Sequence, residues 1–113
     1  GKLDLNVSGS ANMVVNELKT DKLECSINGS GTINLKAGNA EEADYTITTD
    51  GEIMAFGVAV PEVNCKITGK GSSQIHPTDN LKATIVGKGN IRYKGPTAVQ
   101  QKVIGKGTVE EVK

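Results

Sequence analysis

The chain has 113 residues, with 13 basic and 13 acidic side chains, so its formal net charge is zero. Aromatic residues make up only 3% of it, while glycine occurs 14 times. This composition argues against a wide core built on Phe and Trp, and the charge balance argues against a nucleic-acid binder, which would carry a basic excess. We expect residues 1–113 to form one domain. Gly1 is consistent with a scar left by tag removal, in which case a preceding segment is missing.

The chain opens with a strand that alternates inward apolar and outward polar residues, and the same strand recurs before each of six tight turns. Counted back from each turn, three inward positions form columns. The column two residues before the turns is Val7, Ile27, Ile47, Ile67, Ile85 and Val103. The column four residues before is Leu5, Cys25, Tyr45, Cys65, Ala83 and Gln101. The column six residues before is Leu3, Leu23, Ala43, Val63, Leu81 and Val99.

Each of these strands ends in a short corner that is rich in glycine. The corners begin at positions 9, 29, 49, 69, 87 and 105, which are 20, 20, 20, 18 and 18 residues apart. Glycine suits a sharp bend that needs positive φ or a close backbone approach. Ten glycines are therefore predicted to be structural corner residues: Gly9, Gly29, Gly31, Gly51, Gly69, Gly71, Gly87, Gly89, Gly105 and Gly107.

A second short strand follows each corner, and a return of about ten residues leads to the next unit. The second strands share an apolar position, occupied by Met13, Ile33, Ile53, Ile91 and Val109. Ser73 breaks this column, and we expect a bulge there. Turn-forming residues mark the returns, at 37–40, 56–57, Pro61, Pro77 and 95–96. The two best helical windows, 40–43 and 97–102, are short, and the repeat assigns them to a return and a strand.

Six units with one direction, one order and one spacing predict an all-β solenoid. Specifically, the sequence predicts a single-stranded, right-handed parallel β-helix of about six rungs of 18–20 residues. The alternative is an antiparallel sandwich or meander, whose inward pattern would flip with strand direction. The uniform direction of the repeat favours the solenoid.

The two cysteines occupy one column, with Tyr45 between them. Two rungs place Cys25 and Cys65 about 9 to 10 Å apart at their Cα atoms. A disulfide needs less than about 7 Å. We therefore expect two reduced, buried thiols that behave as small apolar residues, with an intermolecular or rearranged disulfide as the alternative.

Three stretches carry a family resemblance: 25–34 (CSINGSGTIN), 85–96 (IVGKGNIRYKGP) and 105–109 (GKGTV). They resemble the putative auto-transporter adhesin, head GIN domain, a bacterial family of uncharacterised function. Its members usually have a less repetitive segment before the repeats, so the resemblance leads us to expect that this chain is a truncated domain or a short member. The corners depart from the family's GSG at the first (GSA), the third (TDG) and the last three (GKG). The resemblance implies a β-helix that is exported to the periplasm or the outer cell surface.

From the sequence we expect no catalytic residue, no metal site and no cofactor. His76 is the only histidine, and we interpret it as a solvated residue of a return. Asp4, Glu24 and Asp44 share an outward column. Such a stripe is able to hold a cation weakly, although it is more typical of a solvated sheet face. No enzyme activity is predicted.

The middle residues of the corners form one more column: Ser10, Ser30, Asp50, Lys70, Lys88 and Lys106. Lys70, Lys88 and Lys106 on successive rungs are a candidate edge for an anionic glycan or lipid head group, or simply solvated lysines. The unpaired first and last rungs favour a homo-oligomer formed through ends or edges. The predicted function is a non-catalytic cell-envelope module that binds a surface glycan or protein. A structural spacer and a carbohydrate-processing or carbohydrate-binding β-helix are the alternatives, and neither nucleic acid nor a membrane span is expected.

Overall fold

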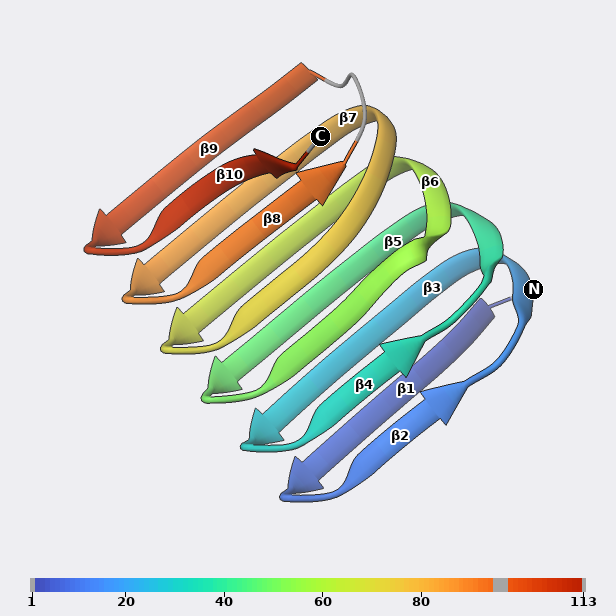
Figure 1. Cartoon of the computed structure of the whole chain (residues 1–113), viewed down its shortest axis with the longest axis horizontal. Coiled ribbons are helices and arrows are strands. Elements are labelled where there is room, and N and C mark those ends of the chain that lie inside the picture. Colours follow the sequence, from blue (N-terminus) through green and yellow to red (C-terminus); the bar gives the residue numbers. More distant parts are fainter. Residues whose placement is uncertain (1, 95–97, 113) are drawn as a thin grey trace.

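Ten β-strands make up nearly all of the chain that the computed structural model describes, which is residues 2–94 and 98–112. The strands are β1 (Lys2–Gly9), β2 (Asn12–Val15), β3 (Leu18–Gly29), β4 (Thr32–Leu35), β5 (Gly38–Thr49), β6 (Glu52–Gly69), β7 (Ser72–Gly87), β8 (Asn90–Lys94), β9 (Ala98–Gly105) and β10 (Thr108–Val112). Figure 1 shows them stacked as a right-handed coil, with the first rung (blue) and the last rung (red) at opposite ends.

Each rung has a leading strand before its corner and a trailing strand after it. The leading sheet contains β1, β3, β5, the second parts of β6 and β7, and β9. The trailing sheet contains β2, β4, the first parts of β6 and β7, β8 and β10. All of these pairs are parallel, which confirms the predicted β-solenoid and excludes the antiparallel sandwich.

The register follows the spacing of the corners in the sequence. The corner residues 9, 29, 49, 69, 87 and 105 are paired in succession, so the repeat lengths of 20 and 18 residues are those of the coil. The coil makes about five turns rather than six. The counts differ because a complete turn needs both a corner and a return, and six corners are joined by five returns.

The core is a thin layer between the two sheets, filled by the predicted columns. Ile27, Ile47, Ile67 and Ile85 are all buried, and each is paired with the next along the leading sheet. Tyr45 is the one large aromatic side chain among the fully buried residues described. β-branched residues suit this space because they pack well on a pleated surface.

The fourth rung is two residues shorter than the third, and the return absorbs the difference. Between β6 and β7 the register is interrupted from Met54 to Ala59 and again from Val60 to Glu62. The paired positions on either side of these interruptions stay in register. The return at 95–96 lies outside the described residues.

The bulge expected at Ser73 is wrong. Ser73 is paired in register with Ile53 on one side and Ile91 on the other. A small inward side chain leaves the backbone ladder unchanged, and the irregularity that a bulge would accommodate lies in the return instead. The Ser73 side chain is 1% exposed. Among the described residues, its hydroxyl has no hydrogen-bond partner of normal geometry.

Both cysteines are free and buried, as the column argument predicts. Tyr45 is paired with Cys25 on one side and with Cys65 on the other. Burial raises the pKa of each thiol to about 12. The Ser73 hydroxyl acts in the opposite direction on Cys65, although burial dominates. Neither thiol has the low pKa and exposure of a reactive cysteine.

Candidate functional site

Most corners contain two glycines, and each is required for a different structural reason. The first glycine takes a left-handed conformation, as at Gly69, where φ is 108°. The second glycine makes room for the preceding rung, since a Cβ at Gly71 would lie 2.4 Å from Cγ2 of Ile47. Thr49 is the one non-glycine residue with positive φ among those described, at 87°.

These corners align the predicted lysine column. The amides of Lys70, Lys88 and Lys106 donate to the carbonyls of Thr49, Gly69 and Gly87, at 2.8, 2.9 and 3.0 Å. The three lysines therefore lie on successive rungs, and all three are exposed. Their role as an anion-binding edge stays a prediction.

The acidic column at the other end of the molecule is interleaved with lysines that the sequence reasoning missed. Lys2 Nζ lies 4.0 Å from Asp4 and 3.4 Å from Glu24, and Lys22 Nζ lies 3.7 Å from Glu24 and 4.0 Å from Asp44. These lysines share the next outward column, two residues before the acids. In the repeat register, Lys2 and Lys22 stand two residues before acids of the column. This spacing was a signal in the sequence for a network of ion pairs.

These ion pairs and hydrogen bonds also shift the pKa values of two of the acids. A hydrogen bond with Glu24 holds the pKa of Asp4 above its ordinary value. The same bond, helped by the two lysines, lowers the pKa of Glu24. The carboxylates are therefore already engaged with one another and with ammonium groups, which weakens the case for a cation held on this stripe.

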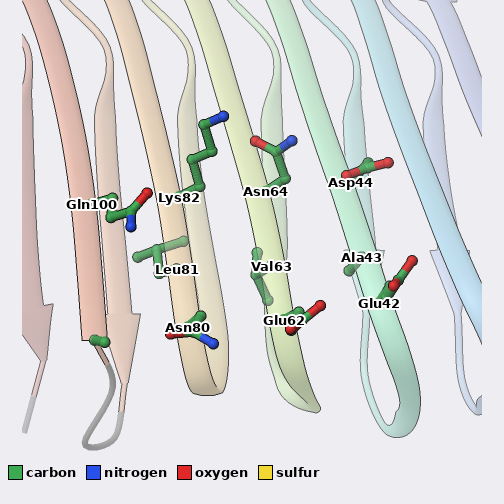
Figure 2. Close-up of a pocket in the computed structure, with 11 residues that line it drawn as sticks. Glu42, Ala43, Asp44, Glu62, Val63, Asn64, Asn80, Leu81, Lys82 and Gln100 are labelled. Atoms are coloured by element: carbon green, nitrogen blue, oxygen red, sulfur yellow. The ribbon is translucent and has the colours of Figure 1, made fainter.

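A groove crosses the outer face of the leading sheet, and the sequence reasoning did not find it. Its volume is about 350 Å³. Figure 2 shows its side chains in two rows, with Glu42, Glu62 and Asn80 in one row and Asp44, Asn64, Lys82 and Gln100 in the other. The rows are outward positions two residues apart on β5, β6, β7 and β9. Four strands at about 4.8 Å spacing make the groove about 14 Å long.

The chemistry of the groove is that of amides and carboxylates on a flat floor. Asn64, Asn80 and Gln100 offer both donors and acceptors, whereas the carboxylates only accept. Glu42 and Glu62 are paired across neighbouring strands and are exposed to solvent. In the described part of the chain, no group of three or more His, Cys, Asp or Glu side chains is arranged to hold a metal ion.

The structure does not bring His76 into a site. It is half-buried and paired with Ala59 in β7, so it belongs to a strand rather than to a loop. It is not among the residues that line the groove. The described residues also contain no helix long and apolar enough to cross a membrane.

Comparison with known proteins gives one family and several solved relatives. Residues 1–96 match the family described as putative auto-transporter adhesin, head GIN domain. No curated protein sequence is significantly similar to this chain.

Three crystal structures share the fold over nearly the whole chain. A putative adhesin from Parabacteroides merdae is 98% identical, with a TM-score of 0.99, and is matched over 100% of this chain and 47% of its own. A putative adhesin from Parabacteroides distasonis is 70% identical, with a TM-score of 0.97, over 99% and 47%. A protein from Parabacteroides distasonis described as a putative lipid binding protein is 34% identical, with a TM-score of 0.96, over 99% and 45%. The chain thus spans about half the length of these solved chains.

Proposed function

Because this chain belongs to the putative auto-transporter adhesin, head GIN domain family, we propose that it is a non-catalytic, adhesin-like binding module of the bacterial cell envelope. Its ligand site is the groove across β5, β6, β7 and β9, and its ligand class is a neutral surface glycan. The observation that supports this proposal is the groove itself, which is long, open and lined by amides and carboxylates on a rigid parallel sheet.

Glycan hydroxyls both donate and accept hydrogen bonds, and the groove offers both kinds of partner along its length. Three carboxylates, from Glu42, Asp44 and Glu62, face one ammonium group, from Lys82. This excess of negative charge disfavours acidic sugars. Holding the residues on sheet strands rather than on loops keeps their spacing fixed, so that little ordering is needed on binding.

The same groove is a poor active site. Glycoside hydrolysis needs one carboxyl group whose proton is retained by an apolar environment, beside a second carboxylate. Glu42 and Glu62 are exposed on an open floor, where water solvates both. A binding role therefore fits the arrangement better than the carbohydrate-processing alternative.

Binding can be tested with a glycan array followed by calorimetry on the best ligand. Replacing Asn64 and Gln100 by alanine removes two amides from the groove, and the loss of one to three hydrogen bonds should weaken affinity by about ten- to a hundredfold. The matched control is Asn6→Ala with Asn28→Ala, which removes two exposed amides from the same sheet outside the groove.

Three results would count against this function. Binding to no glycan by the parent chain would remove the ligand class, and equal losses in the groove and control variants would remove the site. Release of reducing sugar ends that disappears in E42Q/E62Q would establish the carbohydrate-processing alternative.

Export to the periplasm or the outer surface belongs to the same proposal, and it is supported by the family to which the chain belongs. Protease digestion of intact and permeabilised cells distinguishes the two compartments. Protection from protease until the cytoplasm is opened would contradict export.

Self-association through an end of the coil is also proposed. The first rung has only apolar residues at its inward positions, including the half-buried Leu3 and Met13, whereas the last rung has Gln101 and Glu111 at two of its inward positions. The first rung is therefore the better contact, since burying Glu111 would cost free energy. Light scattering should show a dimer that Leu3→Lys dissociates, and a monomer at all concentrations would contradict it.

A further inference from the structure

The corner edge of this neutral protein is strongly divided by charge. The last three corner segments, 66–72, 84–90 and 102–108, contain five lysines and no acidic residue. The first three, 6–12, 26–32 and 46–52, contain two acidic residues and no basic one. Because the segments are stacked in register, this difference becomes a basic half and a neutral-to-acidic half of one continuous edge.

The five lysines form two rows on this basic half. Lys70, Lys88 and Lys106 occupy the middle of successive corners, where their backbone amides are fixed by the ladder bonds described above. Lys66 and Lys102 point outward from the leading sheet, three residues before two of those corners, and both are exposed. Neighbouring rungs are about 5 Å apart, so the rows concentrate positive charge without ordering any loop.

Two aliphatic side chains are exposed between the rows. Val86 is 38% exposed and Ile104 is 54% exposed, and they are paired across β7 and β9. The same outward column holds polar residues in the four earlier rungs: Ser8, Asn28, Thr48 and Thr68. The change from polar to aliphatic therefore occurs on the last two of the three rungs that carry the corner lysines, those of Lys88 and Lys106, and packing of the core does not require it.

We propose that this basic edge, formed by Lys66, Lys70, Lys88, Lys102 and Lys106 around Val86 and Ile104, docks on an anionic phospholipid surface. The lysines contact lipid phosphates, and the two aliphatic side chains enter the boundary between head groups and acyl chains. A soluble acidic glycan would satisfy the lysines but has no apolar phase for Val86 and Ile104. The edge shares no lining residue with the groove, although Lys66 and Lys102 lie in the next outward row beside Asn64 and Gln100. The docking is therefore proposed independently of the groove's ligand.

The expected strength follows from the charges. Each lysine near an anionic membrane strengthens binding by about fivefold, so removal of the three corner lysines should weaken it by roughly a hundredfold. Loss of the exposed aliphatic carbons should weaken it by about tenfold. Binding should also fall steeply with added salt, because these charges are exposed.

The test is co-sedimentation of the chain with vesicles of phosphatidylcholine alone or with about one third phosphatidylglycerol. The variants are K70S/K88S/K106S and V86T/I104T. Serine and threonine already occupy the same columns on earlier rungs, at Ser10 and Thr68 for example, so both variants should fold, as circular dichroism would verify. The charge-matched control is K19S/K36S/K94S, three exposed lysines away from the corners.

The proposal expects binding only to the anionic vesicles, losses of about a hundredfold and tenfold in the two edge variants, and a much smaller loss in the control. It is overturned if the parent chain does not bind anionic vesicles at low salt, or if the control loses as much as the lysine variant. It is also overturned in favour of an acidic polymer if heparin is bound and V86T/I104T binds vesicles as well as the parent. Vesicle binding that is retained in the groove variant N64A/Q100A would separate the two sites.

Discussion

Replacing Ser73 by alanine should stabilise the fold. Ser73 lies in a column whose neighbouring members are Ile53 and Ile91, and its hydroxyl is buried without a normal hydrogen bond among the described residues. In the unfolded chain the same hydroxyl is hydrated, so folding strips it of water without full compensation. Alanine keeps the Cβ and removes only the polar atom.

The magnitude follows from the penalty for an unsatisfied buried group, which is about 1–3 kcal/mol. The Cys65 thiol is the one polar group shown to act with Ser73, and sulfur is a weak partner. We therefore expect Ser73→Ala to raise the free energy of unfolding by about 1 kcal/mol. For 113 residues the entropy of unfolding is about 240 cal/mol/K, so Tm should rise by about 4 °C.

Urea unfolding and calorimetry of the purified variant measure this change directly. Ser72→Ala is the matched control, because Ser72 is the preceding residue and its half-buried side chain points outward. It should change stability by less than about 0.5 kcal/mol. If Ser73→Ala destabilises the protein by 1 kcal/mol or more, the hydroxyl is well satisfied and the reasoning is refuted.

Three further predictions concern the corners and the thiols. Gly69→Ala should lower the free energy of unfolding by about 2 kcal/mol or more, because φ is 108° and the added Cβ would lie 2.7 Å from the Thr49 carbonyl oxygen. Gly9→Ala should lower it by about 1 kcal/mol, because φ is 79° but no atom lies within 4 Å of the added Cβ. Equal losses of stability in urea unfolding would contradict the role of close approach. Thr49→Gly should raise the free energy of unfolding by about 0.5–1 kcal/mol. The change relieves about 1–2 kcal/mol of left-handed backbone strain, and the greater conformational entropy of glycine in the unfolded chain offsets part of this gain. A lowered Tm would contradict the prediction. Cys25 and Cys65 should lower stability above pH 9, because the pKa of each thiol is about 12 in the folded chain and 9.0 in the unfolded chain. Unfolding then releases up to two protons, so the free energy of unfolding falls by up to about 2.7 kcal/mol per pH unit. In C25A/C65A the dependence of the free energy of unfolding on pH from about 9 to 10.5 should flatten, and an unchanged dependence would refute this origin.

The fold was largely predictable because the spacing of the corner glycines in the sequence equals the register offset between paired strands. A corner that favours glycine marks the same position in each rung, and period-2 alternation then assigns the inward columns on both sides. The same logic separated Cys25 from Cys65 by two rungs and gave the free thiols correctly. The return between the fourth and fifth corners was less predictable, because no comparable constraint fixes its residues.

The surface features were harder to predict because they depend on outward side chains from several rungs together. The acidic column of Asp4, Glu24 and Asp44 was predictable from the sequence, but its pairing with Lys2 and Lys22 was not predicted. The aliphatic residues next to the corner lysines were not predicted to join them, because a single exposed valine or isoleucine is common in a strand. Only the register brings these residues into one surface, and the groove depends on sheet shape, which the pattern does not contain.

The shortened fourth rung has a consequence for how this fold changes in evolution and in the laboratory. The spacing between the fourth and fifth corners is two residues shorter than the spacing before it, yet the leading strands on both sides remain paired residue by residue. The returns thus act as buffers of chain length, while each corner has a fixed length. Inserted peptides should be accepted at 78–79, which are exposed and unpaired, without disturbing either sheet. This return is therefore a natural place for recombination, tags or grafted epitopes.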